Sequence, residues 1–177
     1  MKYLIYVGVI VLLLALEAGV FTQFAIRGAI PDLIFLMVIY FATKHEDLDS
    51  YGIALLGGLF TDLYSGLPIG TMTLGYLIVA GLIHVVFHSV TIHEVRWKQI
   101  PFVVSAAVVL LYGWMVGYTW LLVQIHLTGE VLVAADVRTR ILPSLVYNFI
   151  LLYPAMTLFT FLDDFIISIQ KRSRSVI

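Results

Sequence analysis

The feature that most constrains this chain is a series of six apolar runs, separated by short segments that contain most of its charge. A helix needs about 20 apolar residues to cross a bilayer. Hydrophobic residues make up 62% of the 177 residues, so membrane helices would use nearly the whole chain. We therefore expect an all-α membrane protein, a six-helix transmembrane bundle in one multi-pass domain over residues 1–177. The runs predict helices over residues 3–26, 30–43, 51–64, 69–90, 100–125 and 141–169.

Two of these runs are shorter than an ordinary span. Runs 30–43 and 51–64 would form helices of about 21 Å, against a hydrocarbon core of about 30 Å. The charged segment KHEDLDS (44–50) between them is too costly to bury, so they cannot form one helix. We expect them to be short, tilted or cupped inside the bundle. Runs 69–90 and 100–125 are long enough to span, and the mixed segment 126–140 is expected at the membrane interface.

The orientation follows from the basic residues of the short loops. Six spans with the N-terminus inside place seven basic residues on the cytoplasmic face and three on the other face. This bias predicts an inner-membrane protein with both termini in the cytoplasm. The cytoplasmic set is Lys2, Lys44, Arg96, Lys98, Lys171, Arg172 and Arg174, and the other set is Arg27, Arg138 and Arg140.

Composition excludes several function classes. The net charge is −1 and only 12% of residues are charged, which argues against a nucleic-acid partner. The absence of cysteine excludes disulfides, thiolate metal sites and thiol nucleophiles. No Ser-His-Asp set, phosphate-binding glycine loop or pair of acids for general acid/base chemistry is visible. We expect no catalytic residue, no cofactor and no metal.

The densest motif is GGLFTDLYSGLPIG, residues 57–70. A glycine that can adopt positive φ and a proline that fixes φ predict a turn between two helices. We expect Asp62 to accept hydrogen bonds from backbone N–H groups around this turn and so to hold the two helices together. The alternative is a proton or cation ligand. The motif residues are Gly58, Asp62, Ser65, Gly66, Pro68 and Gly70.

Three further polar positions lie inside apolar runs. Asp32, after Pro31, is expected in the first turn of a helix, where the positive end of the macrodipole favours an anion. The alternative is a vestibule, formed with Asp62, that repels anions or attracts cations. Glu17 is expected to face the bundle and to form a hydrogen bond near a helix end, and the alternative is a proton pathway. Asn148, between Pro143 and Pro154, is expected to satisfy backbone groups freed by the prolines or to bond a neighbouring helix.

Histidines and small residues suggest weaker hypotheses. His84 and His88 are spaced i, i+4, and with Glu94 they could form a zinc site, but solvated side chains explain them better. Three pairs of small residues place two small side chains on one helix face, which allows close helix packing inside the bundle or against a partner. The pairs are Ala15 and Gly19, Ala54 and Gly58, and Gly113 and Gly117.

Pro31-Asp32, the 57–70 motif and ILPSLVYNFILLYP (141–154) together resemble the MreD family of bacterial rod shape-determining proteins. The resemblance covers essentially the whole chain. It implies a non-enzymatic subunit of the cell-elongation machinery that binds MreC directly. Through MreC it implies association with RodA, its penicillin-binding transpeptidase and MreB filaments, and hence a role in peptidoglycan synthesis. It also implies a fold similar to the S components of energy-coupling-factor transporters.

That fold suggests the main alternative function, a substrate-binding membrane subunit of a vitamin-type transporter. In such a subunit the short helices and the Asp62 turn would form part of a solute pocket. An intramembrane hydrolase that uses His84, His88 and Glu94 ranks third. We expect the scaffold function first, the transporter subunit second and the enzyme last.

Overall fold

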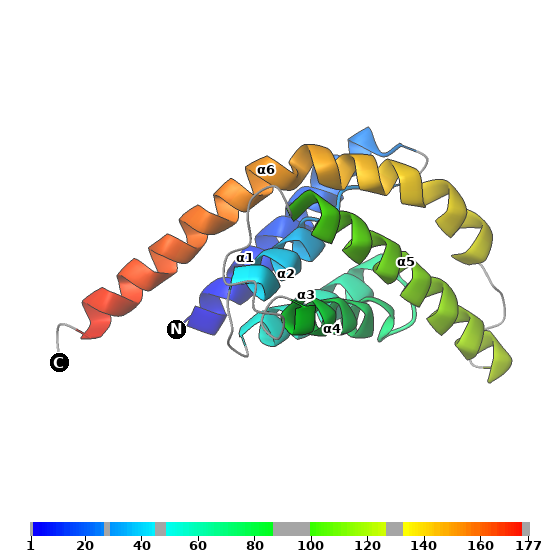
Figure 1. The fold of residues 1–177 in the computed structure, drawn as a ribbon, viewed down its shortest axis with the longest axis horizontal. Coiled ribbons are helices and arrows are strands. Elements are labelled where there is room, and N and C mark those ends of the chain that lie inside the picture. Colours follow the sequence, from blue (N-terminus) through cyan, green and yellow to red (C-terminus); the bar gives the residue numbers. More distant parts are fainter. Residues whose placement is uncertain (1, 27–28, 45–48, 87–99, 127–132, 175–177) are drawn as a thin grey trace.

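The computed structural model describes residues 2–26, 29–44, 49–86, 100–126 and 133–174. Within these residues the expectation of an all-helical chain with six α-helices is confirmed. The elements are α1 (Lys2–Gly19), the 3-10 helix η1 (Phe21–Phe24), α2 (Leu33–Lys44), α3 (Asp49–Ser65), α4 (Thr71–His84), α5 (Ile100–Gln124) and α6 (Val133–Arg174) (Figure 1).

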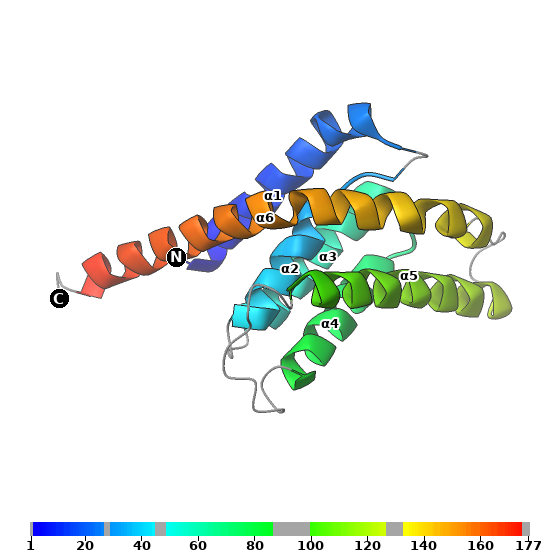
Figure 2. The ribbon, with the colours of Figure 1, turned by 45° about the horizontal axis from the view of Figure 1, so that its top comes forward.

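The short helix α2 forms the centre of the bundle. All of its residues from Leu33 to Thr43 are buried. A helix that is apolar on every side is stable only when neighbours cover every side. α2 contacts each of the other five α-helices, and Figure 2 shows it enclosed among them. Its length is therefore set by the bundle around it rather than by the thickness of a bilayer.

α3 and α4 form the closest helix pair. The turn between them contains two glycines with positive φ, Gly66 (69°) and Gly70 (100°), as the motif predicts. At Gly58 an added Cβ would lie 2.4 Å from the Thr73 Cα and 2.8 Å from the Thr73 nitrogen. Only glycine permits this approach, because the opposing atoms belong to the backbone and cannot move aside cheaply.

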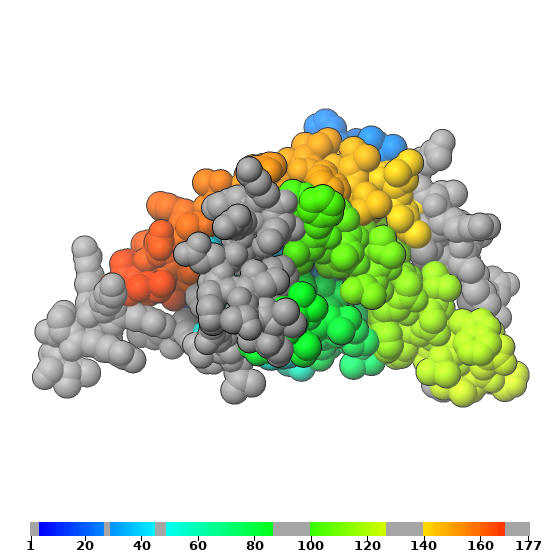
Figure 3. Space-filling view, in the orientation of Figure 1, coloured from blue at the N-terminus to red at the C-terminus, as the bar shows by residue number. Residues whose placement is uncertain are grey.

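Within the residues that the structure describes, α5 and α6 are the two helices long and apolar enough to cross a membrane, over Ile100–Gln124 and Arg140–Ser168. They lie side by side on the face drawn in Figure 3. α6 follows an arc over the other helices (Figure 1). Pro143 and Pro154 lie inside it, and each removes one backbone donor and bends a helix.

The predicted boundaries of the first two helices need correction. The run 3–26 is α-helical only to Gly19 and continues in the 3-10 helix η1. After Gly19 a side chain bonds the last turn of α1, because the Thr22 hydroxyl donates to the Ala18 carbonyl at 2.7 Å. The run 30–43 becomes helical only at Leu33. Asp32 caps that helix from outside, and the residue before Pro31 is disfavoured in helical conformation.

The later boundaries differ as well. Asp49 and Ser50 belong to the segment expected to be too costly to bury, but both are buried at the start of α3. The helix described in the run 69–90 has 14 residues, shorter than the expected span, although residues 87–90 lie outside the described part. α6 begins at Val133, so the second half of the segment 126–140 belongs to this helix rather than to a separate interface segment.

Candidate functional site

The helix ends meet around a cavity of about 380 Å³. It is bounded by the end of α1, the start of α2, the end of α3, the start of α4, the middle of α5 and the first half of α6. One wall is apolar and the other combines acidic, hydroxyl, amide and guanidinium groups. The lining residues are Glu17, Ile30, Pro31, Asp32, Phe35, Thr61, Tyr64, Ser65, Leu67, Met72, Val108, Leu111, Tyr112, Met115, Arg140, Ser144 and Asn148.

Asp62 lies just outside this cavity and caps α4. Its Oδ1 accepts from the Met72 N–H at 2.7 Å. Its Oδ2 accepts from the N–H groups of Gly70 and Thr73 at 2.8 and 3.1 Å, and from the Thr73 hydroxyl at 2.7 Å. The first N–H groups of a helix have no partner inside it. One buried carboxyl therefore joins the end of α3 to the start of α4, which is the arrangement that the structural interpretation of Asp62 requires.

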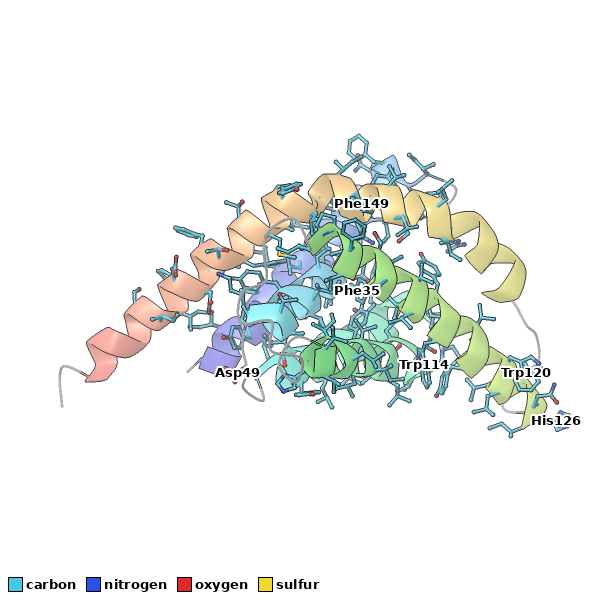
Figure 4. The ribbon with its side chains drawn as sticks, in the orientation of Figure 1. Phe35, Asp49, Trp114, Trp120, His126 and Phe149 are labelled. Carbon is cyan, nitrogen blue, oxygen red and sulfur yellow. The ribbon has the colours of Figure 1, made fainter. Side chains whose placement is uncertain are left out.

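Two aromatic residues of α5 hold the same turn from outside. The Trp114 indole N–H donates to the Thr71 carbonyl at 2.9 Å, and the Tyr118 hydroxyl donates to the Ile69 carbonyl at 3.1 Å. Figure 4 shows Trp114 between α5 and α4. Sequence reasoning missed both residues. The available signal was that an aromatic side chain with a polar atom, inside an apolar helix, needs a hydrogen-bond partner.

Glu17 and Asp32 meet at the start of α2. Glu17 Oε1 accepts from the N–H groups of Leu33 at 2.5 Å and Ile34 at 3.3 Å. Asp32 Oδ1 accepts from the Phe35 N–H at 2.8 Å, as an N-cap side chain does. Glu17 therefore does face the bundle and bond a helix end, but the helix end belongs to α2.

Tyr76 of α4 completes this cluster. Its hydroxyl donates to Asp32 Oδ2 at 2.5 Å, and its ring lies 5.5 Å from that of Phe35 between centroids. Tyr76 is fully buried, so its hydroxyl would be costly without this bond. Glu17 and Asp32 both line the cavity, so the fold brings two acids together that the sequence did not pair. Fifteen residues of sequence separated them.

α6 contributes a polar stripe, Arg140, Ser144 and Asn148, spaced four residues apart and therefore on one face. Asn148 is buried, with 1% of its surface exposed. Its Nδ2 donates to the Ser144 hydroxyl at 3.4 Å, and its Oδ1 has no partner. The expectation that Asn148 bonds freed backbone groups or a neighbouring helix is not met. The stripe faces the cavity instead.

The three pairs of small residues have different surroundings. Ala54 and Gly58 are buried at the contact between α3 and α4. The pair on α1, Ala15 and Gly19, is exposed, as is the pair Gly113 and Gly117 on α5. No atom lies within 4 Å of a Cβ added at Gly19, Gly113 or Gly117. Only the pair on α3 packs inside the bundle.

The proposed histidine site is not supported in the part that can be seen. The His84 ring lies 5.9 Å from that of Tyr51 between centroids. His88 and Glu94 lie outside the described residues. Among the described residues no group of three His, Cys, Asp or Glu side chains is arranged to hold a metal ion.

Comparison with known proteins supplies the family. The curated proteins and the solved structures give no match. A family model described as rod shape-determining protein MreD matches residues 1–162. The match runs through α1 to α5 and most of α6, so it includes both carboxyl-capped helix ends and every residue that lines the cavity. The chain thus belongs to the MreD family of rod shape-determining membrane proteins.

Proposed function

We propose that this chain is a non-enzymatic membrane subunit of the bacterial cell-elongation machinery and that it binds MreC directly. The observation that carries this proposal is the family match over residues 1–162. Through MreC the subunit would act with RodA, its penicillin-binding transpeptidase and MreB filaments in peptidoglycan synthesis. The geometry agrees with a scaffold, because most carboxyl oxygens in the site bond backbone N–H groups of helix ends.

The proposed topology has six spans and both termini in the cytoplasm. The described part of the chain has six α-helices, two of them clearly long enough to span. Together with the seven-to-three distribution of basic residues, these helices support the topology. We further propose that the fold is similar to that of S components. Reporter fusions at the two termini should give the same cytoplasmic signal, and a periplasmic C-terminus would contradict the six-span topology.

The exposed small residues of α5 offer a surface for a partner helix. Gly113 and Gly117 are exposed with open space above them, and small residues permit close helix association in membranes. Gly113→Leu and Gly117→Leu should therefore weaken binding of the MreC transmembrane segment. The matched control is Ala15→Leu, the same kind of change on the exposed face of α1.

The test is co-purification in detergent of the full chain with MreC from a strain that expresses both. Stable co-purification is expected for the unmodified chain, with a loss in the α5 variants while their own membrane levels stay normal. No association with MreC, from a chain that is folded and present at normal levels, would overturn the proposal.

A further inference from the structure

The cavity combines an apolar wall with polar groups that the fold does not use. Its volume of about 380 Å³ lies within the range of about 300–1,000 Å³ typical of small-molecule sites. Val108, Leu111 and Met115 of α5 form the apolar wall. Tyr64 and Ser65 also line the cavity and are exposed, so it opens at the end of α3. In the proposed topology that end faces the periplasm.

Two acceptor atoms in this cavity remain available. Asn148 Oδ1 has no hydrogen-bond partner, although Asn148 is 1% exposed. Glu17 accepts both of its bonds at Oε1, which leaves Oε2. A buried acceptor without a donor destabilises a protein by about 1–3 kcal/mol. A ligand that donates hydrogen bonds could use both of these acceptor atoms.

The charged side chains that line the cavity are two carboxyls, Glu17 and Asp32, and one guanidinium, Arg140. Glu17 and Asp32 both lie at the start of α2, and a helix N-terminus offers only about half a positive charge. Their partners are three backbone N–H groups and the Tyr76 hydroxyl, none of which is cationic. Arg140 lines the same cavity from α6, two turns before Asn148. An ammonium group has several N–H donors on one atom, so it can bond Glu17 Oε2 and Asn148 Oδ1 together.

We infer that the cavity binds the primary ammonium group of an amphiphile, with N–H donors to Glu17 Oε2 and Asn148 Oδ1 and apolar atoms against the α5 wall. The ammonium group belongs either to the headgroup of an aminophospholipid, whose acyl chains stay in the bilayer, or to a free amine. This inference does not depend on MreC, so it is tested on the full chain alone.

The experiment compares ligands of equal charge, of which one has N–H donors and the other has N-methyl groups in their place. Phosphatidylethanolamine and phosphatidylcholine have the same charge, but the choline headgroup has no N–H. The full chain, purified in detergent, is titrated with each lipid and, in separate arms, with ethanolamine and choline. Native mass spectrometry measures occupancy, and thermal melting measures stabilisation. We expect at least about tenfold tighter binding of the ethanolamine form in one pair, because each 1.4 kcal/mol of lost hydrogen bonding is a factor of ten.

Two variants locate the site, and a third is the matched control. Glu17→Gln removes the charge but keeps an oxygen for the α2 end, and Asn148→Leu removes the unpaired acceptor. Asp62→Asn is the same carboxyl-to-amide change at the other capped helix, outside the cavity. We expect the preference for the ethanolamine form to vanish in the first two and to persist in the third.

Each outcome decides the inference. A preference limited to the lipid pair identifies an aminophospholipid, and a preference in the ethanolamine and choline pair identifies a free amine. Equal binding within both pairs by the unmodified chain would overturn the inference without recourse to any variant. The inference would also be overturned if Glu17→Gln and Asn148→Leu fold, as shown by a cooperative melting transition, and keep the preference, because the ligand would then bind elsewhere.

Discussion

The first N–H groups of α4 and of α2 are both bonded by carboxyl side chains, but the two helix starts differ in how many carboxyls they use. At α4 one carboxyl, Asp62, accepts four hydrogen bonds with its two oxygens. At α2 two carboxyls, Glu17 and Asp32, share four. The first set is saturated and lies outside the cavity, whereas the second has an oxygen left over and lines it. We call the first set, Asp62 with the start of α4, the α4 joint, and the second, Glu17 and Asp32 with the start of α2, the α2 joint. Only the α2 joint has an acceptor oxygen left for a ligand.

The largest expected effect follows from removal of the Asp62 carboxyl, which breaks the α4 joint. Asp62→Leu leaves three backbone N–H groups without an acceptor, at about 1–3 kcal/mol each, out of a folding free energy of about 5–15 kcal/mol for a typical domain. We expect little folded protein after detergent extraction, measured as the monodisperse fraction in gel filtration. Asp62→Asn keeps one acceptor oxygen and should be milder. Loss of cell-shape function in Asp62→Asn, with normal membrane levels and MreC binding, would show that ionisation matters instead.

The second largest effect is expected at Gly58, where α3 approaches α4 closely enough for the Asp62 carboxyl to reach the start of α4. Gly58→Ala places a Cβ against the Thr73 backbone, and such overpacking costs about 1–3 kcal/mol. The expected result is a lower melting temperature in detergent. Gly113→Ala is the matched control, because nothing lies within 4 Å of its Cβ. Equal melting of the two variants would mean that α3 and α4 are not held this closely.

The α4 joint could be predicted from sequence and the α2 joint could not. Asp62 and its N–H donors are eight to eleven residues apart, so one turn motif contains both halves of the interaction. Glu17 is sixteen residues from Leu33, and the segment between them folds back through η1. Nothing in the apolar run 3–26 indicated that its helix stops at Gly19. Its own hydropathy favours a continuous span.

The polar wall of the cavity depends on still longer separations. Tyr76 is 44 residues from Asp32, and Asn148 belongs to the last helix. The sequence predicted that Asn148 bonds the backbone groups that the prolines free or a neighbouring helix, because neither its partner nor its position on a cavity is visible locally. Its position on the cavity depends on how α6 packs over α2, which periodicity does not specify when a helix is apolar on nearly every side.

A smaller effect is expected from a change at the start of α2, where the two carboxyls have more acceptor atoms than the helix end uses. Tyr76→Phe removes the hydroxyl that bonds Asp32 Oδ2 and should lower the free energy of unfolding by about 0.5–1.5 kcal/mol, the usual net value of one hydrogen bond. The Phe ring keeps the packing against Phe35. Melting in detergent should fall much less than for Asp62→Leu. A collapse as severe as that of Asp62→Leu would mean that both joints are saturated and that the comparison fails.

The smallest effect is expected at Ser65, and it tests whether the turn contributes to stability apart from the Asp62 carboxyl. The Ser65 hydroxyl donates to the Asp62 carbonyl and accepts from the Leu67 N–H, both at 3.4 Å, and the residue is exposed. Long bonds that compete with water contribute little, and exposed substitutions usually change stability by no more than about 0.5 kcal/mol. Ser65→Ala should therefore melt within about a degree or two of the unmodified chain. A large loss would place the stability of this joint in the turn itself, since Asp62 keeps all four of its bonds in that variant.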